Sequence, residues 1–289
     1  MFFYIKHKTE FTYSRPVFIE PMIVRLRPRS DCTQRLLEFK NDYDVPPSGI
    51  TDLIDLDGNS GSYVWFNETR TSFKIDTTSF VETLHENPFD YILGDPEFSK
   101  LPAKVSGPYE VSLKPYLFRS EVSGKVNSFA ENILKEVDFD TVAFLGALCS
   151  QIHEMIERVL RPTGEPHSPD ELLQTGKGAC RDVTVLFMDA CRSLGLPARF
   201  TSGYFYGDEE FSNRQLHAWA EVFLPGGGWR GYDPTIGLAV ADHHVALASS
   251  PDPVLTAPTS GSYRGTGADS TLEFDITMEE VKSDFVFPG

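Results

Sequence analysis

The hydrophobic pattern of this chain changes its period twice, and this feature constrains the fold more than any other. Apolar and polar residues alternate up to about residue 85, as in FFYIKHKTEFTY, which is typical of strands. From residue 122 to 194 the apolar residues recur at helical spacing, and alternation returns from residue 198 in ARFTSGYFYG, HAWAEVFL and WRGYDPT. Strands, then helices, then strands predict the α+β class, with helices packed on an antiparallel sheet.

The same pattern divides the chain into three predicted regions. We expect a β-rich N-terminal domain over 1–85, a surface linker with five prolines over 86–120, and a mixed core over 121–289. Within the core, apolar stripes predict three long helices, at 122–137, 145–159 and 180–194.

Two further segments of the core carry local signals. The motif SPDEL at 168–172 combines an N-cap serine, a proline at the first helical position and a glutamate three residues after the serine, and it predicts a short helix that ends near Gly176. Residues 249–270 are rich in proline, glycine and serine and predict a loop, and STLEFDITM beyond them predicts a last strand.

Composition argues against several classes of partner. The formal net charge of −16 argues against nucleic acid or an anionic membrane, because both reward clusters of Lys and Arg. No stretch approaches the roughly 20 apolar residues of a membrane-spanning helix, and the apolar start is too short for a signal peptide. Four cysteines in 289 residues do not make a disulfide framework. We therefore expect a cytoplasmic protein with reduced cysteines, and its oligomeric state stays open.

Cys180 is the cysteine whose position indicates chemistry. It follows the glycines of GKGAC and begins the third long helix, where unpaired backbone N–H groups and the helix dipole stabilise a thiolate. The N–H group of Cys180 is also placed to help hold an oxyanion. Cys191 lies eleven residues further along the same helix, too far for a disulfide with Cys180, and its neighbours indicate a small core residue. Cys149 has the same interpretation.

A base and an orienting acid follow in the next two strands. His217 heads the strand HAWAEVFL, PGGG makes a reversal, and Asp233 lies on the returning strand. If the loop has three residues, 225–227, Leu224 pairs with Gly228, and Asp233 becomes the diagonal neighbour of His217 on the same face. A four-residue loop puts Asp233 on the opposite face. The triad of Cys180, His217 and Asp233 therefore requires an odd loop or a glycine bulge, and its chemistry is acyl transfer.

Several motifs together resemble the bacterial transglutaminase-like superfamily, a papain-like fold of cysteine acyl-transfer enzymes. They are GKGACRD, ACRSLGLPARFTSGY, HAWAEVFLPGGGW and YDPTIGL in the core, and HKTEFTYSRPV, VRLRPR and LDGNSG in the β-sandwich-like domain that precedes it. The resemblance implies Cys180 as the nucleophile, His217 as general base and acid, and Asp233 as the group that orients the imidazole. These are the roles that the spacing predicts.

Four other residues are weaker candidates for the site. Asp182, in the first turn after Cys180, either contributes to the site or ties down the preceding loop. Trp219 shares a face with His217, where it either shields the imidazole or belongs to the core. Gln174 lies six residues before Cys180, the offset at which papain-like peptidases place an oxyanion-stabilising glutamine. Tyr204, in SGY, is a candidate for the wall of the substrate cleft.

We expect neither a metal nor a cofactor. The pair His243 and His244 in DHH has no set of cysteines, histidines or carboxylates at ligand spacing around it in the sequence, so we interpret it as a turn. The expected partner is a protein, peptide or other amide substrate.

Three functions remain open at this point. The leading hypothesis is a thiol acyl hydrolase that cleaves a peptide, isopeptide or other amide bond through a thioester. The second is transfer of the acyl group to an amine, and the third is a binding module without activity on the same fold.

Overall fold

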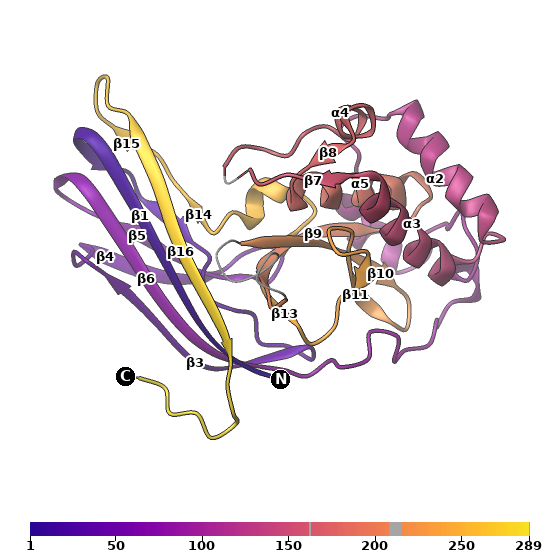
Figure 1. Ribbon diagram of the computed structural model, residues 1–289, viewed down its shortest axis with the longest axis horizontal. Helices are drawn as coiled ribbons and strands as arrows, with labels where there is room; N and C mark the ends of the chain where they lie inside the picture. The colour runs from indigo at the N-terminus through magenta and orange to yellow at the C-terminus, as the bar shows by residue number, and fades with distance from the viewer. Residues whose placement is uncertain (162, 208–215, 289) are drawn as a thin grey trace.

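The computed structural model describes residues 1–161, 163–207 and 216–288. It has a β-rich part with long curved strands and a mixed part in which helices pack against a sheet, and the two parts lie side by side (Figure 1). The predicted α+β class is confirmed. The predicted core range of 121–289 also includes positions 162, 208–215 and 289, which lie outside the described residues.

The β-rich part consists of two antiparallel sheets that pack against each other. The first has the order β15-β1-β6-β3, with β16 also paired to β1. Its strands are β1 (Phe2–Ile19), β3 (Gln34–Tyr43), β6 (Thr69–Thr83), β15 (Tyr263–Arg264) and β16 (Ser270–Glu280). The second has the order β14-β2-β5-β4, with β2 (Met22–Val24), β4 (Gly49–Ile54), β5 (Ser60–Trp65) and β14 (Thr259–Ser260).

Apolar side chains of both sheets form the core of this part. Phe3 and Ile5 of β1 are buried while Lys6 and Lys8 are exposed, which is the alternation expected of a strand with one face on the core. Phe66, which follows β5, and Phe73 of β6 have ring centroids 4.7 Å apart, so the two sheets meet through this pair. The arrangement agrees with the predicted sandwich-like domain.

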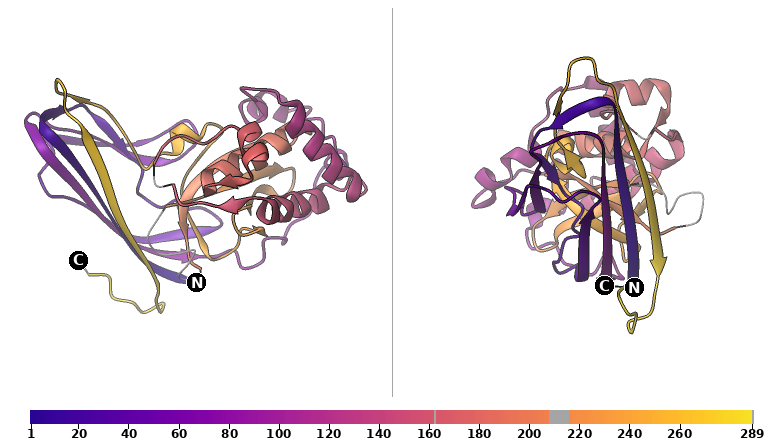
Figure 2. Two further views of the ribbon diagram at one scale, coloured as in Figure 1. Left: turned by 45° about the horizontal axis from the view of Figure 1, so that its top comes forward. Right: turned by 90° about the vertical axis from the view of Figure 1, so that its left-hand side faces the viewer.

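The last strands correct the predicted boundary of the core. The prediction assigned 121–289 to the core, but β14, β15 and β16 pair with strands of the β-rich part. β16 pairs with β1 from Phe3↔Glu280 to Tyr13↔Ser270, and the two strands lie together in every view (Figure 1, Figure 2). Alternation predicts a strand but does not select its partner, and β1 offers β16 an open edge. Residues 249–270, predicted as a loop, contain the short elements η3 (Pro253–Thr256), β14 and β15.

The mixed part packs helices on a five-stranded antiparallel sheet. The sheet order is β12-β11-β10-β9-β13, with β9 (Ala198–Phe205), β10 (His217–Leu224), β11 (Gly228–Asp233), β12 (Leu238–Ala239) and β13 (His244–Ser250). The helices are α2 (Gly124–Glu136), α3 (Thr141–Met155), α4 (Pro169–Thr175) and α5 (Cys180–Ser193). Leu186 and Phe187 of α5 share one buried cluster with Ala220 and Val222 of β10. No helix in the described part of the chain is long and apolar enough to cross a membrane.

The predicted helices are present with shifted ends. The helix expected over 145–159 ends at Met155, because residues 157–158 form β7 (Glu157–Arg158), which pairs in parallel with β8 (Lys177–Gly178). The short helix α4 starts as SPDEL predicts: Ser168 Oγ accepts a hydrogen bond from the Glu171 N–H group at 3.3 Å. The predicted linker contains only short helices within 86–120, namely η1 (Pro96–Phe98), α1 (Tyr109–Ser112) and η2 (Lys114–Leu117).

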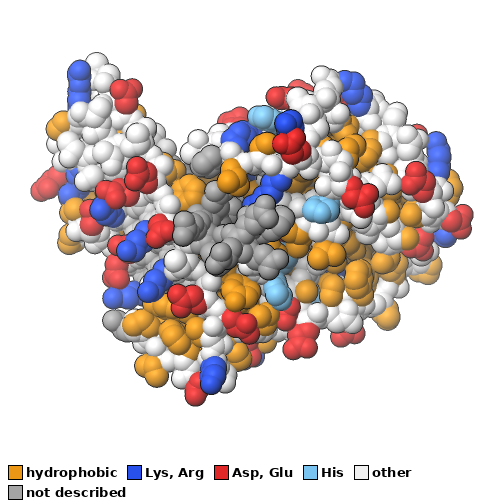
Figure 3. Space-filling view, viewed as in Figure 1, with side chains coloured by type: hydrophobic (Ala, Val, Ile, Leu, Met, Phe, Trp, Pro, Cys, Tyr) orange, Lys and Arg blue, Asp and Glu red, His pale blue; other side chains and the backbone are white. Residues whose placement is uncertain are grey.

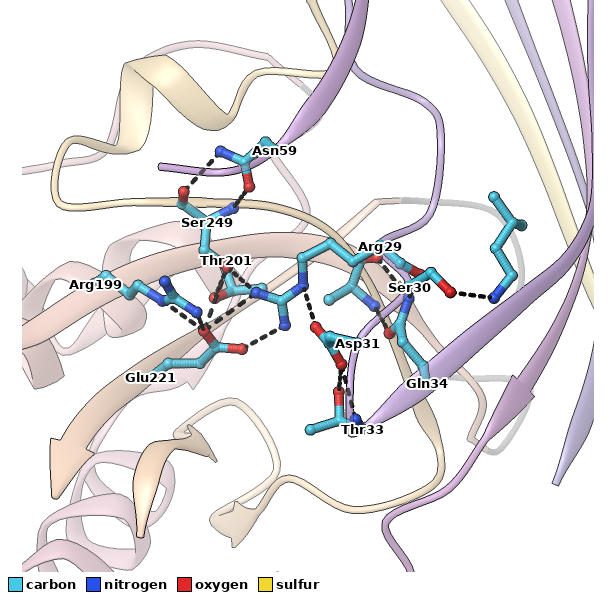
Figure 4. A network of polar contacts seen from close by, with 12 residues as sticks. Arg29, Ser30, Asp31, Thr33, Gln34, Asn59, Arg199, Thr201, Glu221 and Ser249 are labelled. Carbon is cyan, nitrogen blue, oxygen red and sulfur yellow. Dashed lines mark hydrogen bonds and ion pairs between the residues drawn. The ribbon is translucent and has the colours of Figure 1, made fainter. Parts of the chain in front are cut away.

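Side-chain amides of the β-rich part bind the open edge of β13. The Gln34 side chain accepts from the Ala246 N–H group at 2.7 Å and donates to its carbonyl at 3.0 Å. Asn59 does the same to Ser249, with both distances at 2.8 Å (Figure 4). Two amides therefore take the place of a neighbouring strand on an edge that would otherwise be unpaired.

A buried ionic network lies beside these amides. Glu221 of β10 accepts from Arg29 of the β-rich part at 2.8 Å and from Arg199 of β9 at 2.7 Å (Figure 4). Arg29 also donates to Ser249 Oγ at 2.7 Å. Burial alone would raise the pKa of Glu221, but the charges and hydrogen bonds of the two arginines lower it well below its usual value. The two parts are therefore joined by charge as well as by apolar contact.

Candidate active site

The nucleophile candidate is held by a tight turn at the start of α5. Asp182 Oδ2 accepts the Ala179 N–H group at 2.8 Å, which fixes the N-cap and makes Cys180 the first helical residue, as predicted. A Cβ atom on Gly178 would lie 2.5 Å from Leu172 Cδ1, so only glycine allows the turn to pass this close to α4. The Cys180 side chain is partly exposed.

The β10–β11 hairpin has the register that the triad requires. Leu224 pairs with Gly228 and Ala220 with Tyr232, which confirms the three-residue loop. Gly226, at the centre of this loop, has φ +88°, and a Cβ there would lie 2.5 Å from the Gly94 nitrogen. The glycines therefore make the odd loop possible. They put Asp233 on the face of His217, one residue beyond the Ala220–Tyr232 pair.

The structure brings Cys180, His217 and Asp233 together. His217 Nε2 lies 2.5 Å from Asp233 Oδ2, and Cys180 lines the same cavity as His217, which interacts electrostatically with its thiol. Since Nε2 is engaged by the carboxylate, Nδ1 is the nitrogen that remains for the sulfur. His217 is 6% exposed and Asp233 is fully buried. A thiol, an imidazole and a carboxylate thus gather at one place, and a hydrogen bond joins the imidazole to the carboxylate.

Electrostatic interactions favour the ionised forms of Cys180, His217 and Asp233. Burial alone would lower the pKa of His217, but the charge and hydrogen bond of Asp233, together with Cys180, raise it to about 10. Burial would raise the pKa of Cys180, but the hydrogen bond and charge of His217 lower it below its usual value. Both shifts favour a thiolate beside an imidazolium over a neutral thiol beside a neutral imidazole.

His244 is a member of the site that the sequence analysis missed. Its Nε2 lies 3.1 Å from Asp233 Oδ2, the oxygen that also receives His217, while the Thr235 N–H group donates to Oδ1 at 2.9 Å. His244 is not part of a turn; it starts β13 and pairs with Phe205. A signal was present in the sequence: HVALA after His244 has the same form as HAWAE after His217, with a histidine leading an apolar strand.

The two histidines and Asp233 are also of the types that bind metal ions. One ligand atom from each lies within 4.8 Å of the others, and all three residues are buried. Both histidine Nε2 atoms are already hydrogen-bonded to the carboxylate. An ion here would have to break the contacts that orient His217.

The remaining predicted residues have different places. Trp219 is 1% exposed, and its ring centroid lies 6.4 Å from that of His217 and 5.0 Å from that of His244. It therefore covers the imidazole side of the triad. Tyr204 belongs to the core shared with the β-rich part, where its hydroxyl lies 3.0 Å from His7 Nδ1.

Asp182 and Gln174 are positioned by the turn before α5. Asp182 is fully buried and accepts the Ala179 and His167 N–H groups, both at 2.8 Å, and Arg161 Nη2 at 2.5 Å, so it holds the loop in place. Gln174 does not reach the site: its side chain is exposed on α4. Gly176, with φ +64°, ends α4 and turns the chain away before Cys180.

A cavity of about 500 Å³ opens beside Cys180 between the two parts of the molecule. His7, Thr9 and Phe274 of the β-rich part line it together with Cys180 and His217. Figure 3 shows the depression between the parts on one face. A larger cavity, about 580 Å³, lies among β3, β4 and β5 and contains none of the predicted site residues. The cleft at the junction is therefore the place where a substrate would meet the thiol.

Two known protein families match parts of this sequence. Residues 127–234 match the Transglutaminase-like superfamily, and residues 3–82 match the Bacterial transglutaminase-like N-terminal region. Uncharacterized protein ML0607 of Mycobacterium leprae is 23% identical over 280 residues, which cover 95% of this chain and 96% of the relative. Protein-glutamine gamma-glutamyltransferase of Pseudomonas aeruginosa is 30% identical over 149 residues, 46% of this chain and 22% of that protein.

The fold of this chain is similar to that of a protein with a known crystal structure. The "Putative Cysteine Protease" from Cytophaga hutchinsonii superimposes with a TM-score of 0.73 at 21% identity, over 99% of this chain and 92% of its own. At this identity the likeness shows that both parts of the fold are shared.

Proposed function

Because the chain belongs to the transglutaminase-like superfamily and carries the N-terminal region of its bacterial members, we propose that it is a thiol acyl hydrolase that cleaves an amide bond. The observation that carries the proposal is the unbroken contact from Cys180 through His217 to Asp233, with the sulfur at a helix N-terminus beside an open cavity. The words cysteine protease in the name of the Cytophaga protein agree with hydrolysis.

The first half of the reaction forms a thioester. The Cys180 thiolate adds to the substrate carbonyl, and the first-turn N–H groups of α5 face the oxygen that gains charge. The His217 imidazolium then gives its proton to the amide nitrogen, the C–N bond breaks, and the amine leaves. The acyl group remains on Cys180 Sγ, and His217 is neutral.

The second half releases the acid. Neutral His217 takes a proton from water, the resulting hydroxide adds to the thioester carbonyl, and the C–S bond breaks. The products are a carboxylic acid, the Cys180 thiolate and the His217 imidazolium, so the enzyme returns to its starting state. Asp233 stays ionised throughout and holds the ring in orientation.

Acyl-enzyme trapping tests the proposal. A library of peptides and cell-wall fragments is mixed with the protein and quenched in acid, and intact-mass and peptide mass spectrometry then locate any adduct. We expect a thioester on Cys180 and none on Cys180→Ala, which should fold normally because the side chain is small and partly exposed. Adducts of equal yield on Cys180→Ala would contradict the proposal.

Amine transfer is the second candidate, favoured by the likeness to the Pseudomonas gamma-glutamyltransferase over 46% of this chain. The triad serves either acceptor, and only access to the thioester differs. Product masses measured with and without an added primary amine separate the two reactions. If the products are the same with and without the amine, transfer is excluded. If amide products form with the added amine, transfer replaces hydrolysis as the leading function.

A further inference from the structure

The cavity beside Cys180 is lined by cations in an otherwise acidic protein. The chain has a formal net charge of −16, and acidic side chains are spread over the face in Figure 3. Among the described residues that line the cavity, the Arg and acidic side chains are Arg158, Arg161, Arg181 and Glu165. This reversal of sign at the nucleophile favours an anionic ligand.

Arg161 already has its partners. Its Nη2 donates to Asp182 Oδ1 at 2.5 Å and its Nη1 to the Glu165 carbonyl at 2.7 Å. Its charge therefore offsets the buried Asp182 carboxylate and keeps the loop before α5 in place. Arg161 therefore has a structural role and is not available to a ligand.

Arg181 lacks an acidic partner. Its Nη2 donates to the Thr163 carbonyl at 2.5 Å, its Nε is buried without a hydrogen bond, and no carboxylate of the described residues lies within ion-pair distance of it. Burial and the nearby charge of Arg161 lower the pKa of Arg181, and the charges of Asp182 and Cys180 only partly offset this. The guanidinium is thus partly desolvated, repelled by another cation, and unpaired beside the sulfur of Cys180.

We infer that Arg181 binds a carboxylate of the substrate close to the amide carbonyl that Cys180 attacks. This inference rests on the proposed function and names its substrate class: peptides or amides with a free carboxylate near the cleaved bond. A carboxylate suits the site because its two oxygens match the planar donors of a guanidinium. It would also supply an ion-pair contact, which no carboxylate of the described residues makes with Arg181.

Two alkylating reagents test the inference without a known substrate. Iodoacetate and iodoacetamide both form a thioether when the thiolate displaces iodide. The two reagents differ in one group only: iodoacetate carries a carboxylate where iodoacetamide carries a neutral amide. The ratio of their rates at Cys180, followed by peptide mass spectrometry, is compared with the ratio for N-acetylcysteine. We expect the Cys180 ratio to exceed the free-thiol ratio by about tenfold, the effect of one charge-assisted contact.

Variants assign the effect to one side chain. Arg181→Gln should lower the ratio to that of the free thiol, Arg181→Lys should keep part of it, and the distant control Arg35→Gln, on β3 with 59% of its side chain exposed, should keep all of it. If Arg181→Gln does not fold, the wild-type ratio at low and high NaCl replaces it, since salt should reduce only the iodoacetate rate.

The outcomes separate the two proposals. Fast iodoacetamide labelling with a free-thiol ratio would overturn the carboxylate site and leave the activated thiolate intact. Labelling of Cys180 by iodoacetamide no faster than of N-acetylcysteine would overturn the proposed function. A high ratio that survives Arg181→Gln would show that another group attracts the anion and would also overturn the inference.

Discussion

At the scale of single residues, the site depends on how one buried carboxylate is shared. Asp233 receives both His217 and His244 on the same oxygen, and burial of the whole group would be costly without these contacts. Burial keeps the pKa of His244 below its usual value in spite of Asp233, so His244 donates as a neutral ring while His217 carries the proton. The two histidines therefore have different roles.

Removing the charge of Asp233 should disable His217. In Asp233→Asn the carboxylate no longer stabilises the imidazolium, so the pKa of His217 falls and that of Cys180 rises. We expect acylation of Cys180 to slow by on the order of 100-fold or more, the usual contribution of a positioned acid or base. Stopped-flow acylation measures the rate, and circular dichroism checks the fold. An unchanged rate would remove Asp233 from the mechanism.

Removing the second donor should have a smaller effect. His244→Leu replaces the imidazole by an apolar side chain that cannot donate and so removes one hydrogen bond to a charged group, for which we expect a roughly tenfold slower acylation. If His244 acts through Asp233, the double variant with Asp233→Asn should be no slower than Asp233→Asn alone. Fully additive losses in this cycle would show that His244 acts by another route.

At the scale of elements, the β10–β11 hairpin decides whether the triad exists. A one-residue change in the loop would move Asp233 to the other face of the sheet. Gly226 allows the three-residue loop for two reasons: it has a positive φ, and a Cβ atom at this position would lie only 2.5 Å from the Ile92 carbonyl oxygen. The loop therefore also depends on the segment before η1.

A pair of glycine variants separates conformation from close contact. Gly58→Ala places alanine at φ +81° with no atom within 4 Å, so it should cost only the conformational term of about 1–2 kcal/mol. Gly226→Ala, at φ +88°, should cost a further ~1–3 kcal/mol for overpacking. Urea denaturation gives both values. Equal losses would show that the loop does not need its contact with Gly94 and Ile92.

Local patterns predicted much of this fold, and distant pairings set the rest. The start of α5 at Cys180 followed from glycine positions, which are local, whereas strand period left two hairpin registers open and only the requirement of the triad favoured the observed one. The partner of β16 and the contact of His244 with Asp233 were missed, because both join segments far apart in the chain. The end of the helix at Met155 was also missed, since β7 gains its partner β8 only in the folded protein.

At the scale of the whole molecule, the cleft exists only where the two parts meet. The β-rich part supplies one wall of the cavity, and Gln34, Asn59 and Arg29 join it to the sheet that carries His217. β10 carries both Glu221, which holds the interface, and His217, which belongs to the triad. The interface and the site are therefore expected to lose order together.

Breaking the interface charge should destabilise the protein strongly. Glu221→Gln leaves Arg29 and Arg199 facing a neutral amide, and we expect a loss of about 3–5 kcal/mol in the free energy of unfolding. The control Arg35→Gln breaks an exposed pair with Glu82 and should cost about 0–1 kcal/mol. Because folding lowers the pKa of Glu221 from 4.5, its contribution is full above pH 4.5 and declines below it. Denaturation at several pH values measures this, and a pH-independent difference would contradict it.

The pH dependence of Cys180 alkylation tests the central claim most directly. Folding lowers the pKa of this thiol from its usual value, so the iodoacetamide rate should fall with decreasing pH at a lower pH than it does for an ordinary thiol. In His217→Ala the rate should instead rise only above about pH 8.5, the value of an ordinary thiol, or higher because of burial. A wild-type profile that matches His217→Ala would show that Cys180 is not an activated nucleophile.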